Sequence, residues 1–184
     1  MNVSLSLRGE GFLLLSRFRD YAVSGRLKPM FKLDSEKELM TAFRPKDRKS
    51  VELPRDMKFP LFVRNYVAWS HPAGGKTYLV FSVPGGVPTG IAFNTAGDGP
   101  SVPQMCDWCH TGAVNGDVGI ITAKISGKRT AGVFVCTDIA CARKIEDEAN
   151  RNGVSPLPAL ATLLERMGRF ANEGLGIDLT AAGR

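Results

Sequence analysis

Four cysteines in two pairs constrain the fold of this chain more than any other feature of its sequence. The first pair is Cys106-x2-Cys109 in "QMCDWCHTG", and the second is Cys136-x4-Cys141 in "VFVCTDIACARK". Thiols in such numbers form two disulfides, a redox centre or a metal site. The residues between and after the pairs favour one of these arrangements over the others.

The segment between the pairs predicts a β-hairpin, and the segment after it predicts a helix. "VGIITAKI" and "AGVFVC" are strand-like, and "SGKRT" joins them through a turn at Gly127. "TDIACARKIEDEANRNG" then has a helical pattern. Thr137 or Asp138 can cap this helix and Gly153 can end it, which puts Cys141 in its first turn.

We call the turn that carries Cys106 and Cys109 the knuckle. The order of knuckle, hairpin and helix brings the four sulfur atoms around one tetrahedral centre. Zinc accepts four thiolates in such a site and then has no open position for chemistry. We therefore expect one structural zinc ion per chain on Cys106, Cys109, Cys136 and Cys141. A closed shell of this kind, together with the lack of a catalytic triad or paired carboxylates, predicts that the protein is not an enzyme.

The other arrangements fit less well. A redox Cys-x2-Cys motif would not explain the second pair. Disulfides conflict with the reducing compartment that the rest of the sequence indicates. An iron–sulfur cluster also uses four cysteines, but the knuckle–hairpin–helix order fits zinc better.

The charge and hydropathy of the chain bear on its partners and its location. There are 24 Lys and Arg residues against 18 Asp and Glu, and the formal net charge is +6. This balance favours acidic partners such as RNA or an acidic protein face, although a mildly basic surface with no partner is an equal alternative. No apolar run approaches a membrane span or a signal peptide, so we expect a cytoplasmic protein.

The remaining segments predict an α+β domain with helices at both ends. Residues 1–29 are expected to be an appendage without stable structure, and residues 30–184 the domain, with the knuckle, hairpin and helix over 104–153. "DSEKELMTAF" predicts a helix capped by Asp34 or Ser35, and "LFVRNYVAW" and "TYLVFSV" predict strands of an antiparallel sheet.

A C-terminal helix is predicted over residues 155–172. Ser155 is a candidate cap, and Pro156 suits the first helical position. Apolar residues recur at three- and four-residue steps, which predicts that this stripe packs on the protein's own sheet rather than on a partner. The stripe consists of Leu157, Leu160, Leu163, Leu164, Met167 and Phe170.

At "MCDWCHT" and "FVCTDIAC" the sequence resembles the FBP domain. This treble-clef zinc finger is the C-terminal domain of elongation-factor-G-binding proteins, which include the FusB-type fusidic acid resistance proteins. The resemblance extends over about residues 31–150 and includes "SEKELMTAF", "ELPRDM" and a Trp-x-Asp-Pro element at Trp69–Pro72. His71 replaces the acidic residue of that element.

The resemblance implies a zinc-binding adaptor of the translation apparatus. Its partner would be elongation factor G, free or in a ribosomal complex, with no membrane and no small-molecule substrate. We expect the partner face to surround the knuckle, with Trp108 exposed between the zinc ligands and joined by His110, Lys128 and Arg129. Tryptophan is enriched at the centres of binding surfaces.

The alternative function is an RNA-binding zinc finger. The basic segment 44–58 and the hairpin residues Lys124, Lys128 and Arg129 would then contact phosphates. Salt dependence separates the two functions, because RNA binding weakens steeply as salt rises.

Overall fold

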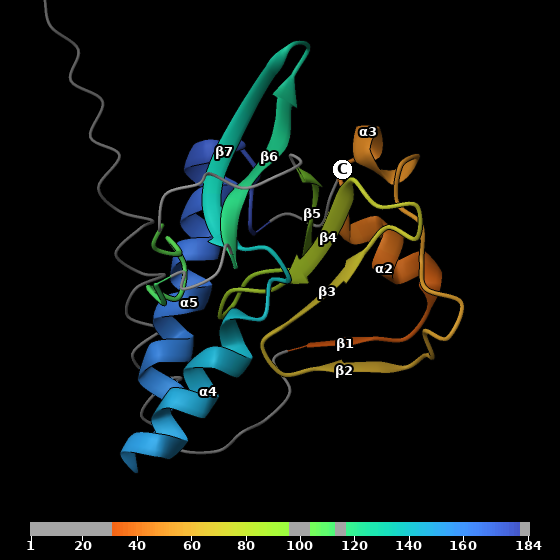
Figure 1. Cartoon of the computed structure of the whole chain (residues 1–184). Helices are drawn as coiled ribbons and strands as arrows, with labels where there is room; N and C mark the ends of the chain where they lie inside the picture. Colours follow the sequence, from red (N-terminus) through yellow and green to blue (C-terminus); the bar gives the residue numbers. More distant parts are fainter. Residues whose placement is uncertain (1–30, 96–103, 113–116, 181–184) are drawn as a thin grey trace, which may run out of the picture.

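The computed structural model describes residues 31–95, 104–112 and 117–180, which form an α+β fold with two antiparallel sheets. The larger sheet has the strand order β3-β4-β5-β6-β7 (Figure 1). Its strands are Tyr66–Ser70, Lys76–Phe81, Thr89–Thr95, Val118–Ser126 and Arg129–Cys136. Each strand pairs with its neighbours in sequence, as the alternation of strands and short turns predicts.

A second, two-stranded sheet was not expected from the sequence. Strand β1 (Phe31–Leu33) pairs with β2 (Leu61–Val63). The run "LFVRNYVAW" therefore does not form one strand, because a bend at Arg64 and Asn65 divides it between β2 and β3. The two halves belong to different sheets, and periodicity within the run does not reveal this.

Four helices and a π-helical turn complete the described residues. Helix α2 spans Glu36–Ala42, α3 Pro45–Arg48, α4 Cys141–Asn152 and α5 Leu157–Arg169, and the π turn spans Phe170–Gly174. Ser35 caps α2 by accepting from the backbone N–H of Glu38, as predicted. No helix in these described ranges is long and apolar enough to cross a membrane.

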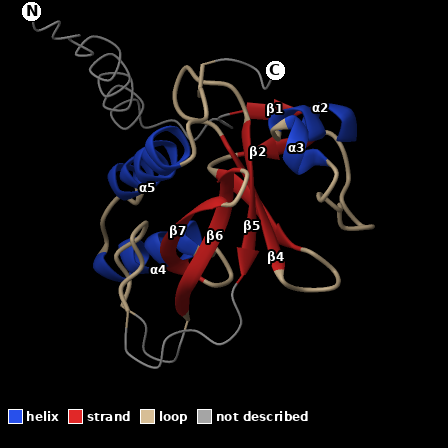
Figure 2. Ribbon diagram, turned by 90° about the horizontal axis from the view of Figure 1, so that it is seen from above, coloured by secondary structure: helices blue, strands red, loops and turns tan. Residues whose placement is uncertain are grey.

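The larger sheet separates two apolar clusters. Residues alternate between the faces of a strand, so Leu79 and Phe81 of β4 face the cluster under α4 and α5, while Tyr78 and Val80 face the cluster under α2. Figure 2 shows α4 and α5 on one side of the sheet and β1, β2, α2 and α3 on the other. The treble clef lies on the α4 and α5 side.

The C-terminal helix packs on the protein's own core, as its apolar stripe predicts. Leu160, Leu163, Leu164 and Met167 are buried and belong to the cluster shared with the sheet. The regular α-helix begins at Leu157, one position after Pro156, and Ser155 accepts from the N–H of Leu157. This stripe therefore gives the helix its place in the fold.

Candidate metal centre

The knuckle that carries the first two cysteines is a tight reversal of the chain. Met105 and Gly112 form an isolated antiparallel bridge across it, and the N–H of His110 donates to the carbonyl oxygen of Cys106 at 2.8 Å. His110 adopts φ 59°, a left-handed conformation that turns the chain back on itself. The backbone N–H of Cys109 points at the sulfur of Cys106, at 3.4 Å.

The second pair of cysteines lies where the hairpin meets the helix. Cys136 is the last residue of β7, and Cys141 is the first residue of α4. The helix starts later than the sequence predicts, because residues 137–140 form a turn in which Ile139 has φ 48°. Asp138 stabilises this turn by accepting from the N–H of Ala140, instead of capping a longer helix.

The four sulfur atoms surround one point. All four lie within 4.8 Å of one another, with 3.7 Å between the sulfurs of Cys106 and Cys141 and 3.6 Å between those of Cys109 and Cys136. A zinc ion bound to four thiolates at about 2.3 Å requires sulfurs about 3.8 Å apart. The cysteines are free thiols at this spacing, and they form the site of one structural zinc ion.

The electrostatics of the cluster favour a bound cation. Hydrogen bonds from its three cysteine neighbours hold the pKa of Cys109 well below the usual range of a thiol. Hydrogen bonds to Cys106 and Cys109 raise the pKa of Cys141. Four sulfurs this close repel one another when all are ionised, so a cation must accompany four thiolates.

Lys144 provides further positive charge at the centre. Its ammonium group lies 3.4 Å from the sulfur of Cys136. Burial alone would lower the pKa of Lys144, but the charge of Cys136 and this hydrogen bond outweigh burial and raise it. Lys144 therefore stays charged beside the thiolates and offsets part of their negative charge.

Trp108 contradicts the expectation of an exposed residue between the zinc ligands. Its side chain is 1% exposed and belongs to the cluster under α5. Its ring lies edge-on to Phe93 of β5 and Phe170 of the π turn, with centroids 6.1 Å and 6.4 Å away. The knuckle lies on the core rather than above it, so Trp108 is a packing residue.

Two contacts hold the knuckle in this position. Nη1 of Arg166 in α5 donates to the carbonyl oxygen of Trp108 at 2.7 Å. Asp107 pairs with the outer edge of β7, where its N–H donates to the carbonyl oxygen of Phe134 and its carboxylate accepts from the N–H of Phe134. The edge of β7 is therefore covered at this point by the chain itself.

The structure divides the other expected partner residues between two places. His110 is exposed at the knuckle, whereas Lys128 and Arg129 are exposed at the tip of the β6–β7 hairpin. The knuckle contacts β7 at Phe134, five residues along the strand from Arg129, which corresponds to about 17 Å at the usual rise of a strand. These residues therefore do not form one continuous face.

A cleft that the sequence did not reveal opens beside the zinc ligands. It has a volume of about 390 Å³ and lies between the knuckle, α4, α5 and the loop that joins the helices. Its lining includes His110, Ile145, Glu148, Val154 and Arg166. Val154, which also lines the cleft, is 59% exposed. Ile145 and Glu148 lie on one face of α4, but their meeting with His110 and Arg166 depends on how α4 packs against α5 and the knuckle.

A closed four-thiolate centre in a knuckle, hairpin and helix defines a treble-clef zinc finger. The chain belongs to the FBP C-terminal treble-clef zinc-finger family, whose model matches residues 37–173. This match confirms the resemblance that the cysteine motifs indicate. No curated protein matches the chain.

One solved structure that the chain matches is that of the fusidic acid resistance protein FusC. It is 14% identical in sequence, with a TM-score of 0.47. The similarity covers 76% of this chain and 58% of FusC, so the chain spans little more than half the length of that protein.

Proposed function

We propose that this protein is a zinc-binding adaptor of the translation apparatus that binds elongation factor G, free or on the ribosome. Its membership of the FBP zinc-finger family supports this proposal, because the cysteine motifs resemble those of elongation-factor-G-binding proteins. The closed zinc shell supports binding rather than catalysis, since four thiolates leave no position for a substrate. Such an adaptor would act in the cytoplasm.

The observation that carries the proposal is the cleft beside the treble clef. Its lining includes the buried apolar side chains of Ile145 and Ala149 in α4, together with the exposed His110 and Glu148 and the half-buried Arg166. An apolar centre with a polar rim is the usual composition of a protein-binding surface. Val154 stands exposed at this cleft, where a partner's apolar side chain would cover it.

Binding of the purified full chain to purified elongation factor G tests the proposal. Val154→Asp introduces a charge into the cleft without removing a core side chain, and we expect it to weaken binding about tenfold or more. Phe62→Asp is the matched control, because Phe62 is 66% exposed on β2, in the other sheet. It should bind like the wild type.

Zinc content and thermal unfolding of both variants establish that they fold. The proposal fails if the wild-type protein does not bind elongation factor G. It also fails in its choice of surface if Val154→Asp binds normally or if Phe62→Asp weakens binding equally. Binding should persist in the presence of competitor RNA.

A further inference from the structure

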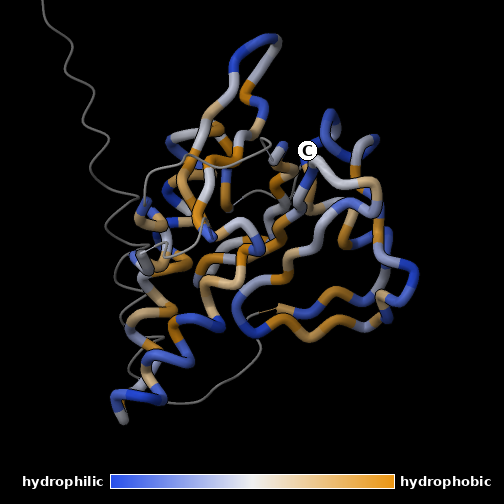
Figure 3. The backbone as a smooth tube through the Cα atoms, in the orientation of Figure 1, coloured by the Kyte–Doolittle hydropathy of each residue, from blue (hydrophilic) through white to orange (hydrophobic). Residues whose placement is uncertain are grey.

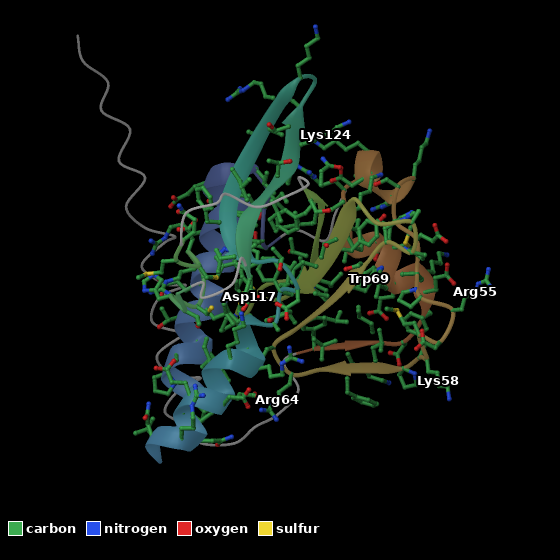
Figure 4. The ribbon with its side chains drawn as sticks, viewed as in Figure 1. Arg55, Lys58, Arg64, Trp69, Asp117 and Lys124 are labelled. Atoms are coloured by element: carbon green, nitrogen blue, oxygen red, sulfur yellow. The ribbon has the colours of Figure 1, made fainter. Side chains whose placement is uncertain are left out.

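The β6–β7 hairpin and helix α3 together form a basic surface. We call the surface formed by Lys46, Lys124, Lys128 and Arg129 the hairpin–α3 surface. All four residues are exposed. Figure 4 shows Lys124 near the hairpin tip, on the side of α3, and Figure 3 shows both the tip and α3 as hydrophilic. The surface joins segments that lie far apart in the sequence.

The pairing of the strands explains why these segments meet. β6 pairs with β5 through Ile121, Thr122 and Ala123, and beyond Ala123 this edge of β6 has no β5 partner. At the same end of β5, Gly90 instead forms a bridge with Phe43, which lies two residues before the start of α3. A Cβ atom on Gly90 would lie 2.7 Å from the ring of Phe43, so glycine permits this close approach.

Two basic side chains fasten α3 to the free edge of the hairpin. Nη2 of Arg44 donates to the carbonyl oxygen of Lys124 at 2.8 Å, and the ammonium group of Lys46 donates to the carbonyl oxygen of Ile125. Nε of Arg44 also binds the carboxylate of Asp47 at 2.5 Å. Lysine has three donors, so Lys46 can contact a ligand while it keeps this bond.

The surface carries little negative charge to offset its cations. The sequence from Val118 to Cys136, which forms the whole hairpin, contains no Asp or Glu. The nearby Asp47 is 7% exposed and paired with Arg44. Ser126 and Thr130, both exposed beside the turn, add hydroxyl donors of the kind that bind phosphate oxygens.

The surface fits a nucleic acid better than a protein. Protein interfaces depend on apolar or aromatic anchors at their centres. The exposed large apolar side chains of the described ranges are Phe62, Met105, Ile120 and Val154, and none of them lies at the hairpin tip. Cations and hydroxyls on a narrow two-stranded ribbon instead match the closely spaced phosphates of an RNA backbone.

We propose that the hairpin–α3 surface binds the phosphate backbone of RNA, at a place separate from the cleft beside the zinc centre. The binding is electrostatic and independent of base sequence. The basic segment after α3 does not take part as a whole, because Figure 4 shows Arg55 and Lys58 far from Lys124 and the hairpin. The proposal does not depend on binding to elongation factor G.

Fluorescence anisotropy of the full chain with a labelled single-stranded RNA tests the proposal. The RNA should be longer than about 16 nucleotides, the largest site that a single OB-fold domain covers. With three to four phosphate contacts, the affinity should fall with salt with a logarithmic slope of about −2 to −3. The double variant Lys128→Ala/Arg129→Ala should reduce the affinity about tenfold or more and make the slope shallower by about 1.4.

The double variant Arg55→Ala/Lys58→Ala is the matched control. It removes the same charge from exposed positions far from the hairpin, and it should bind RNA like the wild type. Lys128→Arg/Arg129→Lys keeps both charges and should also bind normally. Elongation factor G binding, measured on the same variants without RNA, should be unchanged in all of them.

Three outcomes would overturn the proposal. The first is that the wild type fails to bind RNA at about 50 mM salt, where electrostatic binding is strong. The second is that the control variant loses as much affinity for RNA as the hairpin variant, which would mean that net charge alone matters. The third is that the hairpin variant loses binding to elongation factor G instead of RNA, which would assign this surface to a protein partner.

Discussion

The hydroxyl group of Tyr66 donates a hydrogen bond to the carbonyl oxygen of Ile139 at 2.5 Å, although 73 positions separate the two residues. The same oxygen of Tyr66 accepts from the N–H of Ala142 at 3.0 Å, in the first turn of α4. Ile139 has φ 48°, which a β-branched residue rarely adopts. Strand β3 therefore holds the turn that places Cys141 at the zinc centre.

Tyr66→Phe should destabilise the protein by about 1–3 kcal/mol, because it leaves the Ile139 carbonyl and the Ala142 N–H without their partner. Urea unfolding measures this loss. Zinc should still bind, but a chelator should remove it faster than from the wild type.

Tyr78→Phe serves as the control for this variant. Its hydroxyl group donates to the carbonyl oxygen of Ser50, in the cluster on the other side of the sheet. It should lose stability without losing zinc faster. Equal rates of zinc loss from the two variants would show that Tyr66 does not position the turn.

Trp108→Ala should cost about 3–5 kcal/mol of unfolding free energy, because it opens a cavity between Phe93 and Phe170. Trp108→Phe should cost less. Thermal unfolding measures both, with Met105→Ala as the control, since Met105 is 59% exposed in the same knuckle. A Trp108→Ala protein as stable as the Met105 variant would contradict the burial of this side chain.

Removal of zinc should unfold at least the finger. Structural zinc contributes on the order of 10–16 kcal/mol of apparent binding free energy, which exceeds the net stability of most domains. Elemental analysis should give one zinc ion per chain, and Cys136→Ser should lose both the metal and the fold of the finger. Chelation should proceed faster at lower pH, because protons compete with zinc for the thiolates.

Fluorescence of Trp108 reports this unfolding directly when Trp69 is replaced by Phe. Its emission should shift to the red as the knuckle leaves the core and the indole ring enters water. A zinc-free chain with an unshifted spectrum, or a disulfide mapped between two of the four cysteines, would contradict a structural zinc site.

Truncation to Met30 should leave the melting temperature and the zinc content unchanged. Residues 1–29, expected to form an appendage, lie outside the described residues. The FBP family model matches residues 37–173, which leaves residues 1–29 outside the matched domain. A marked loss of stability or zinc would place residues 1–29 within the folded domain.

The zinc centre was predictable because its determinants are local. Cysteine spacing, the turn at Gly127 and the end of α4 at Gly153 follow from a few neighbouring residues, and the structure has both turns, with φ 51° and 65°. The amphipathic pattern of α5 likewise predicted its buried face. Each of these signals depends on residues that are close to one another in the sequence.

The predictions from sequence failed where the structure depends on contacts between distant segments. No local pattern indicates that Trp108 meets Phe170, or that "LFVRNYVAW" divides between two sheets. The late start of α4 depends on Tyr66, far back in the chain, and the union of α3 with the hairpin depends on where β6 leaves β5. Tertiary packing decides such features, and a single sequence does not encode them in a form that periodicity reveals.

The contact between Arg166 and Trp108 joins the zinc knuckle to a helix that follows it in the sequence. All four thiols precede α5 in the sequence, and a chain emerges from the ribosome with its N-terminus first. The nascent protein can therefore capture its metal while the indole ring still faces water. Helix α5 emerges after the four thiols, and its packing then covers the indole ring beside the metal centre.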